Sequence, residues 1–252
     1  MLTKSNTLII SAVTAGVLLC STSAFATSQG SGLFGDAISI AAGAHFTNNY
    51  VWRGVSQTDN GPAMQGYFDL KTNFGLTVGA WGSNVNFVDT QGDTATTELD
   101  YYANFSHDFD KLNVNVGAVR YVYPRANGLD WNEFSAGVGY TFFDSLSTNL
   151  SAHFSSDVLG SSERGTYYQL AANYDIPASV LSMQGFSVGG HVGRYNFATV
   201  TGLGNYTDYS AYVNKSLTDH VGVGLAWTGT NGGLNAGNAD DNHIVASISA
   251  NI

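Results

Sequence analysis

Apolar and polar residues alternate along most of this chain with a period of two. In the segment that begins at Leu146, the apolar Leu150 and Phe154 lie at even positions, while the polar Ser151 and His153 lie at odd positions. Successive side chains of a β-strand point to opposite faces, so such a segment has one apolar and one polar face. Beyond residue 26 the chain has neither an apolar run near the ~20 residues of a spanning helix nor the three-and-four spacing of an amphipathic one. The sequence therefore predicts an all-β fold.

The alternating pattern predicts twelve strands. The segments are 38–52, 62–72, 74–85, 96–107, 111–123, 131–142, 145–155, 166–175, 184–195, 205–216, 219–229 and 242–252. Tight turns such as Thr218-Asp219 alternate with longer, polar, glycine-rich connections such as 54–61 and 229–241. An even strand number with short turns at one end and long loops at the other is typical of bacterial outer-membrane barrels. We therefore expect an antiparallel transmembrane β-barrel of about 12 strands, with both termini on the periplasmic side.

The first 26 residues have the layout of a secretory signal peptide. A basic start at Lys4 precedes an apolar stretch from Leu8 to Leu19, and Ala24-Phe25-Ala26 supplies the small residues of a cleavage site. We expect residues 1–26 to be a cleaved signal peptide, 27–37 a short periplasmic segment and 38–252 the barrel. The expected location is the bacterial outer membrane, with the barrel assembly machinery as a partner during biogenesis.

Composition excludes several classes of function. Only 11% of residues are charged, against about 25% in ordinary soluble domains, and the formal net charge is −10. A negative chain is a poor partner for a phosphate backbone, so we expect no nucleic-acid binding. The polar strand faces are rich in Gly, Ser, Thr and Asn and poor in charge, which suits a lumen, whereas the opposite faces suit lipid. A soluble exported β-sandwich or lipocalin-like barrel remains an alternative, because it also alternates.

Aromatic and basic residues near the strand ends predict contacts with the membrane interface. In outer-membrane barrels, aromatic side chains form girdles at both interfaces. Trp52, Trp81, Trp131 and Trp227 fall toward the outer end of their segments. Arg120 and Arg194 fall on the lipid-facing parity, where a long side chain reaches the interface. We expect Arg120, Arg194, Trp52 and Trp227 to contact outer-membrane lipid or lipopolysaccharide.

A family resemblance adds to this interpretation. The stretch from Tyr50 to Ala63, YVWRGVSQTDNGPA, resembles a motif of the TorF-like proteobacterial porins, also called the Gcw_chp family. The similarity continues through Trp81-Gly82-Ser83-Asn84-Val85, Glu98-Leu99-Asp100-Tyr101-Tyr102 and Tyr206-Thr207-Asp208-Tyr209. It spans nearly all of the chain after the signal segment. The resemblance implies an outer-membrane barrel of porin type, and it carries over no catalytic residue and no solute.

Charged residues on the predicted luminal faces suggest a vestibule near the outer mouth. By strand parity, five charged residues point inward there: Arg53, Glu98, Asp100, Glu133 and Asp208. Rings of acidic side chains favour cations, and an opposing Arg creates a constriction. We therefore expect a narrow pathway for passive diffusion of small polar solutes, with a preference for cationic or neutral ones. The alternative is an internal salt-bridge network that plugs the barrel, leaving a nonconducting barrel with a structural or surface-interaction role.

The sequence gives little indication of a catalytic, metal or cofactor site. His153 and Ser155 resemble the pair of an outer-membrane lipase, but both are expected inside the barrel, away from lipid, so we expect no enzymatic activity. Loop carboxylates lack the dense spacing of a calcium site, so no metal is expected. They are Asp59, Asp89, Asp93, Asp130, Asp157, Asp240 and Asp241. His45 and His191 are expected to be luminal polar side chains. No cofactor is expected, and the oligomeric state stays open.

Overall fold

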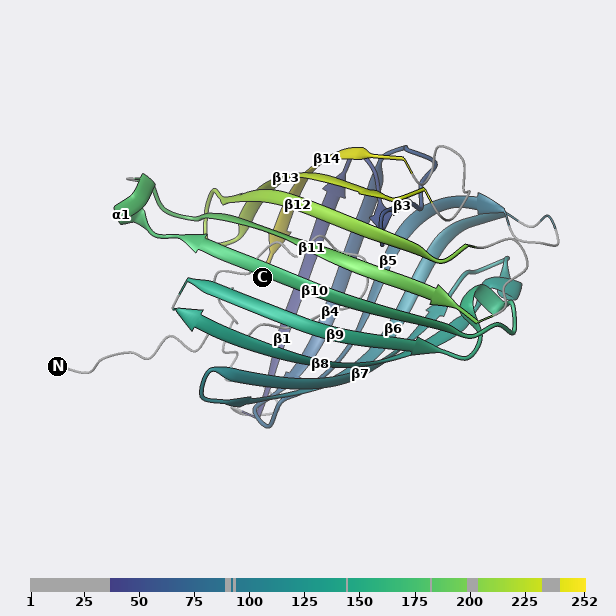
Figure 1. Ribbon diagram of the computed structural model, residues 1–252, viewed down its shortest axis with the longest axis horizontal. Helices are drawn as coiled ribbons and strands as arrows, with labels where there is room; N and C mark the ends of the chain where they lie inside the picture. Colours follow the sequence, from purple (N-terminus) through teal and green to yellow (C-terminus); the bar gives the residue numbers. More distant parts are fainter. Residues whose placement is uncertain are drawn as a thin grey trace.

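Twelve antiparallel strands close into one barrel (Figure 1). The computed structural model describes residues 37–88, 92, 94–143, 145–181, 183–198, 204–232 and 241–252. Each barrel strand pairs with the next barrel strand along the chain, and β1 (Ile38–Thr47) pairs with β14 (His243–Asn251) to close the ring. The expected all-β, twelve-stranded antiparallel barrel is confirmed. The predicted signal peptide, residues 1–26, lies outside the described residues.

The remaining elements are as follows. The other barrel strands are β4 (Ala63–Thr72), β5 (Leu76–Val88), β6 (Thr94–Phe109), β7 (Leu112–Val122), β8 (Trp131–Phe143), β9 (Leu146–Ser155), β10 (Gly165–Ile176), β11 (Phe186–Phe197), β12 (Tyr206–Ser216) and β13 (Val221–Thr230). A separate two-stranded sheet consists of β2 (Val51–Trp52) and β3 (Val55–Ser56). The helical segments are η2 (Asn127–Leu129), η3 (Val158–Gly160) and α1 (Ala178–Leu181).

The alternation in the sequence becomes an apolar outer surface and a polar inner one. In β9, Leu150 and Phe154 are exposed on the outside, whereas Ser151, His153 and Ser155 are buried inside. The same arrangement recurs around the ring, so large apolar side chains cover the outer wall. An apolar band of this kind faces hydrocarbon in outer-membrane barrels. Closure leaves no open sheet edge, which would have unpaired backbone groups in lipid.

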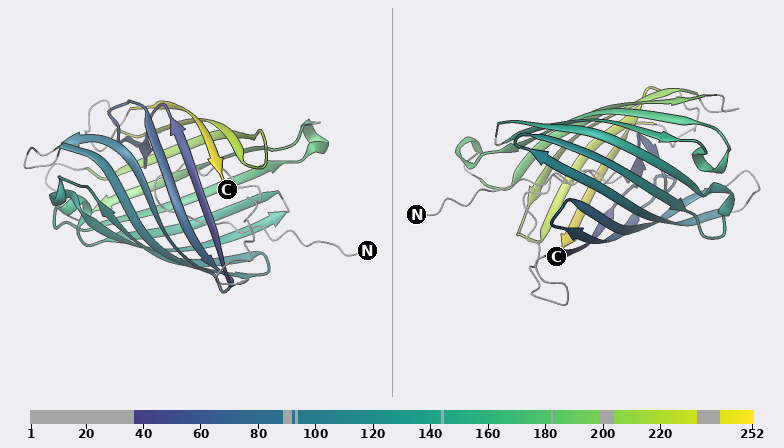
Figure 2. Two further views of the ribbon diagram at one scale, coloured as in Figure 1. Left: turned by 180° about the vertical axis from the view of Figure 1, so that it is seen from behind. Right: turned by 90° about the horizontal axis from the view of Figure 1, so that it is seen from below.

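The two ends of the barrel differ. In Figure 1 the strands β8 to β11 form the near wall and β1 and β4 the far wall, and the two walls cross because barrel strands tilt. One end, the short-turn end, carries tight turns such as residues 73–75 and the short helix α1. The other, the long-loop end, carries η2, η3 and the β2–β3 hairpin (Figure 2). Within the described ranges, no helical segment has the length and hydropathy to span a membrane.

The chain leaves the barrel wall earlier than the sequence predicts. We expected one strand over 38–52, but β1 ends at Thr47, and this expectation was wrong at its C-terminal end. The Asn48 side chain takes over the backbone pairing with β14: Nδ2 donates to the Ile244 carbonyl (3.1 Å) and Oδ1 accepts from Ala246 N–H (2.8 Å). Because that amide satisfies the partner strand, the chain after Asn48 is free to turn inward.

Residues 48–61 then form an inward loop around the β2–β3 hairpin. Its turn places Arg53 and Gly54 at positive φ, +47° and +79°. Local hydrogen bonds replace the lost ladder: Gln57 N–H donates to the Tyr50 carbonyl (2.7 Å), and Tyr50 N–H donates to Thr58 Oγ1 (3.1 Å). We call residues 48–61 the inward loop.

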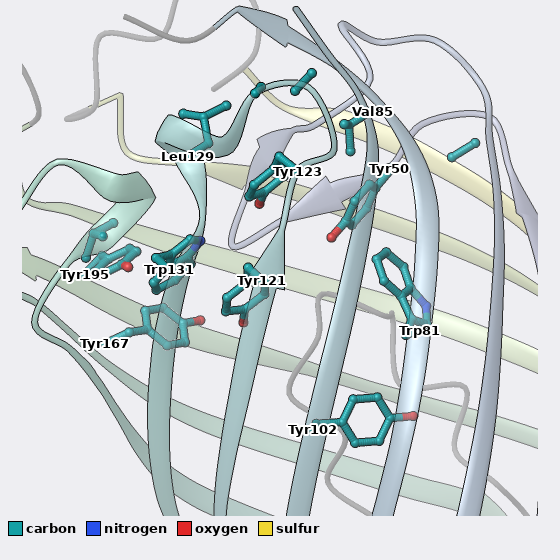
Figure 3. Packing of buried hydrophobic residues seen from close by; sticks show 14 of the residues in the cluster. Tyr50, Trp81, Val85, Tyr102, Tyr121, Tyr123, Leu129, Trp131, Tyr167 and Tyr195 are labelled. Atoms are coloured by element: carbon teal, nitrogen blue, oxygen red, sulfur yellow. The ribbon is translucent and has the colours of Figure 1, made fainter.

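Aromatic side chains gather inside the long-loop end and hold the inward loop (Figure 3). The buried members of this luminal aromatic cluster are Tyr50, Trp81, Tyr102, Tyr121, Tyr123, Trp131, Tyr167, Tyr195 and Tyr206, with small apolar residues between them. On the opposite side of the lumen, Val51 of the inward loop packs against Ala226 of β13 and Val245 of β14. The loop therefore contacts walls on both sides of the barrel.

Candidate functional site: a luminal constriction

The centre of the constriction is an ion pair between the inward loop and the wall. Arg53 projects from the turn of the β2–β3 hairpin, and both of its terminal nitrogens donate to Glu133 of β8, over 2.9 and 2.7 Å. Both side chains are buried, 5% and 2% exposed. A bidentate guanidinium–carboxylate pair fixes direction as well as distance. The pair therefore fastens the tip of the inward loop to the barrel wall.

Three aromatic rings surround the same guanidinium. The Arg53 Cζ atom lies 4.0 Å from the ring centroid of Tyr167, 4.3 Å from Trp52 and 4.9 Å from Tyr195. Each distance is within the range of a cation–π interaction, which contributes roughly 0.5–2 kcal/mol. The rings come from the inward loop, β10 and β11, so Arg53 joins three parts of the barrel. Such a position fits a fixed structural cation better than a mobile one.

Glu133 also contacts a histidine that the sequence suggested as part of a lipase pair. His153 Nδ1 lies 3.3 Å from Glu133 Oε1, and its Nε2 lies 3.1 Å from Ser151 Oγ. His153 is 1% exposed. Ser155 is likewise buried in the lumen, and the hydroxyl next to the imidazole is Ser151 instead. His153 therefore belongs to the Arg53–Glu133 network.

Asp208 forms a second polar site near the hairpin turn. Its Oδ2 lies 2.7 Å from His191 Nε2 and accepts a hydrogen bond from the Tyr167 hydroxyl at 3.2 Å. Its Oδ1 is buried without a hydrogen-bond partner in the described residues. Gly54 packs against the Cβ of Asp208, because a Cβ built at Gly54 would lie 2.9 Å from it. Asp208 therefore lies beside the turn without pairing with Arg53.

Glu98 and Asp100 follow each other along the inner face of β6. The Tyr50 hydroxyl donates to Glu98 Oε1 at 3.2 Å. Burial and the carboxylates of Glu98 and Asp100 raise the pKa of Tyr50 well above its usual value, so this phenol stays a donor. Asp100 is 0% exposed, and neither of its oxygens has a hydrogen-bond partner among the described residues. A buried carboxylate without a partner is costly.

Acidic groups outnumber basic ones among the buried charged residues that the structure describes. Five carboxylates are buried in the lumen, and the single buried cation is Arg53. The carboxylates are Asp69, Glu98, Asp100, Glu133 and Asp208. Lys71 adds one half-buried ammonium, 3.8 Å from Asp69. Of these carboxyl groups, Glu133 is the one that forms a close pair with Arg53, so acidic side chains outnumber basic ones in the described interior.

The structure brings together only part of the expected vestibule. Arg53, Glu98, Asp100, Glu133 and Asp208 all point into the lumen near the long-loop end. Arg53 reaches this place from the turn of the β2–β3 hairpin. We had predicted its inward direction from strand parity, as if residue 53 continued the first barrel strand. Of the four carboxylates, it pairs with Glu133 alone.

The expectation for Trp52 was wrong. Its ring lies inside the barrel, 6.0 to 6.3 Å from the centroids of Tyr121, Trp131 and Tyr195, and does not face lipid. Trp81 and Trp131 are also buried inside, so they do not form the outer girdle. The early end of β1 explains the first error, because parity counted along one strand does not apply beyond Thr47.

The other predicted interface residues lie on the outer surface. Trp227 is 46% exposed and stacks on Tyr209, with ring centroids 5.0 Å apart. Arg120 pairs with Asp130 at 3.1 Å, and Arg194 donates to Thr207 Oγ1 at 3.1 Å. Their side chains point outward from β7, β11 and β13 at the long-loop end. Contact with lipid stays a prediction.

Sequence reasoning did not identify the aromatic partners of Arg53. Tyr167 and Tyr195 lie on strands far from the inward loop in the sequence, and no local motif connects them. A signal for the loop itself was available, since the polar pair Asn48-Asn49 interrupts the apolar alternation. Among the described residues, no group of three or more His, Cys, Asp or Glu could hold a metal ion. Of the loop carboxylates, Asp89, Asp93 and Asp240 lie outside the described residues.

Solved structures that share this barrel architecture include two porins. The KdgM porin aligns with a TM-score of 0.57 at 6% identity, covering 83% of this chain and 98% of its own. The NanC porin aligns with a TM-score of 0.59 at 8% identity, covering 83% and 97%. A structure of the KdgM porin in complex with disordered oligogalacturonate aligns at 0.54 and 6% identity, covering 84% and 98%. At these identities the likeness concerns the fold.

This protein shares the closed antiparallel β-barrel fold of the KdgM and NanC porins. No curated protein matches its sequence significantly. The family described as "Bacterial protein of unknown function (Gcw_chp)" matches residues 35–250, which is most of the chain. The resemblance expected from the sequence is thereby confirmed, and the chain belongs to the Gcw_chp family.

Proposed function

We propose that this barrel is a passive channel for small polar solutes that favours cationic and neutral solutes over anions. The observation that carries the proposal is the buried charge of the lumen, five carboxylates against one guanidinium. Acidic side chains along a pore lower the energy of a passing cation and raise that of an anion. Asp208 contributes to this preference, because its Oδ1 is not hydrogen-bonded to the protein that the structure describes.

The proposed solutes differ from the one bound in a structurally similar porin. The KdgM porin has been solved with disordered oligogalacturonate, which is a polyanion. A lumen with surplus carboxylates would repel such a chain. We therefore propose that this protein shares the barrel architecture of that porin and serves solutes of different charge.

A nonconducting barrel is the second candidate function. The inward loop and the luminal aromatic cluster contact both sides of the lumen, which favours a closed barrel with a structural or surface-interaction role. Twelve strands lie between the filled eight-stranded and the open sixteen-stranded barrels, so strand number does not decide. The two candidates differ in whether solutes can pass between the inward loop and the barrel wall.

Single-channel recording on refolded protein separates the two functions. We expect discrete conductance steps, and we expect Arg53→Ala to increase their size, because the tip of the inward loop then loses its ion pair with Glu133. Arg120→Ala is the matched control, since it removes an exposed Arg–Asp pair on the outer surface. Absence of steps in both the native protein and Arg53→Ala would favour the nonconducting barrel.

We also propose that Trp227, Arg120 and Arg194 contact outer-membrane lipid or lipopolysaccharide. Trp227 is the tryptophan that the structure exposes on the outer wall, whereas Trp81 and Trp131 are buried in the lumen. In bilayers with brominated acyl chains, we expect strong quenching of tryptophan fluorescence that Trp227→Phe largely removes. Quenching that survives Trp227→Phe but disappears in Trp52→Phe would contradict the assignment.

A further inference from the structure

Four tyrosines inside the barrel share one arrangement. In each case the phenol group lies over a glycine of the adjacent strand, and its hydroxyl donates to a polar side chain one strand further along the wall. The four sets are Tyr67–Gly43–Asn251, Tyr102–Gly79–Asp69, Tyr212–Gly189–Asn173 and Tyr167–Gly193–Asp208. We call these sets the tyrosine braces. Each brace therefore spans three neighbouring strands.

The glycine of each brace allows the ring to lie against the wall. A Cβ built at Gly79 would lie 2.6 and 2.7 Å from Cε2 and Cζ of Tyr102, and one at Gly43 would lie 2.5 Å from Cε1 of Tyr67. Cβ atoms do not approach other atoms so closely in a packed interior. The hydroxyl holds the other end of the ring, as in the 2.5 Å bond from Tyr102 to Asp69. Figure 3 shows Tyr102 reaching across a neighbouring strand.

The tyrosine braces lie on two walls of the barrel. Two of them run through β14, β1, β4, β5 and β6, and they meet on β4, which supplies both Tyr67 and Asp69. The other two connect β10, β11 and β12. In Figure 1, β10 and β11 belong to the near wall, and β1 and β4 to the far wall. Because each ring runs along its own wall, none of these four rings crosses the lumen toward the opposite wall.

The lumen between the constriction and the short-turn end contains open space. Its inward-facing residues are small or polar and only partly buried, unlike the fully buried ones around Arg53. Examples are Asn115, Asn149, Asn173 and Gly224. A partly exposed residue that faces the lumen borders open space, and Tyr67 and Tyr212 are partly exposed in the same way. A tyrosine ring displaced from the wall would fill part of this space.

We propose that Gly43, Gly79, Gly189 and Gly193 set the bore of the lumen, because they let the four tyrosine rings lie back against the wall. The glycines are positioning residues, which act through the rings and touch no solute themselves. The proposal rests on the proposed channel and deepens it, since the bore determines the size of the solutes that pass. It does not depend on the charge of the lumen.

Gly79→Ala is the clearest test, because the atoms nearest to its Cβ position belong to the side chains of Asp69 and Tyr102 and not to the backbone. We expect the added methyl group to break the bond between these two side chains and to move the ring into the lumen. Single-channel conductance in a planar bilayer should fall below that of the native barrel. Gly139→Ala is the matched control, since this buried glycine of β8 also faces the lumen but its Cβ position has no neighbour closer than 3.4 Å. Unchanged conductance in Gly79→Ala, or an equal loss in Gly139→Ala, would overturn the proposal.

Removing the displaced ring distinguishes positioning from general damage to the wall. In the double variant Gly79→Ala with Tyr102→Ala, we expect conductance to return at least to the native value. Conductance that stays low in the double variant would mean that the alanine distorts β5 itself, which would overturn the proposal. If Gly79→Ala does not refold, Gly43→Ala with and without Tyr67→Ala provides the same comparison in a second brace.

Chemical modification reports the ring position without a current. We expect tetranitromethane to nitrate Tyr102 severalfold faster in Gly79→Ala than in the native barrel, as measured by mass spectrometry of the refolded protein, and Gly139→Ala to have no effect. A silent barrel with this faster nitration would contradict the channel and support the bore-setting role. A conducting barrel in which Gly79→Ala changes neither nitration nor conductance would support the channel and overturn that role.

Discussion

Arg53 is the residue on which the constriction depends. It forms a buried bidentate pair with Glu133 and lies within cation–π distance of three rings, of which Tyr167 and Tyr195 are buried and Trp52 is partly buried. Removing one partner of a buried pair leaves an uncompensated charge, which costs about 3–5 kcal/mol, whereas exposed pairs contribute about 0–1 kcal/mol. The difference in burial between Arg53 and Arg120 therefore predicts a difference in stability.

We expect Arg53→Ala to lower the free energy of unfolding by about 3–5 kcal/mol, and Arg120→Ala by less than about 1 kcal/mol. The measurement is equilibrium unfolding by urea of the two refolded variants in the same detergent. Replacing both partners, in Arg53→Met with Glu133→Leu, should recover part of the loss, because no charge is then left buried. Equal losses for Arg53→Ala and Arg120→Ala would contradict the buried pair.

For single residues, the sequence predicted which side chains point into the lumen better than it predicted which of them pair with each other. Strand parity placed Glu98, Asp100 and Glu133 on the inner face, because a period of two is a property of each strand alone. It could not predict that Arg53 pairs with Glu133 and not with Asp100. That choice depends on where the hairpin turn lies in the lumen, which is set by contacts with β10 and β11.

Among the elements, the inward loop differs most from expectation. The alternation through Phe46, Tyr50 and Trp52 continues the pattern of β1, but the last two rings face the luminal aromatic cluster and not lipid. An aromatic residue satisfies either environment, so hydropathy does not distinguish the two. The turn at Gly54 is the geometric requirement: its φ is +79°, and a Cβ there would lie 2.7 Å from the Gly229 carbonyl oxygen.

Gly54→Ala should therefore loosen the inward loop. Gly232→Ala is the matched control, because Gly232 also has positive φ (+75°) but open space around its Cβ position. We expect hydrogen exchange to become faster at the amides of Tyr50 and Gln57 in Gly54→Ala, since their bonds hold the hairpin. Unchanged exchange in Gly54→Ala, or an equal effect of Gly232→Ala, would mean that the close packing at the turn does not hold the loop.

The whole molecule was the most predictable part. Twelve alternating segments with short and long connections predicted the strand number, the antiparallel order and the difference between the two ends, because each follows from local patterning. The inside of the barrel was less predictable, since an inward loop is positioned by long-range contacts. The sequence did predict that acidic side chains line the interior. This prediction needs only the strand alternation and the residue types, and neither depends on long-range contacts.

The central claim concerns that charge: a barrel with five buried carboxylates and one buried guanidinium favours cations. The most direct test is the reversal potential of the refolded barrel in a planar bilayer under a KCl gradient. We predict a reversal potential whose sign shows higher permeability for K⁺ than for Cl⁻, and a smaller preference in Asp208→Asn. A reversal potential of the opposite sign, showing that Cl⁻ passes more readily, would contradict the account.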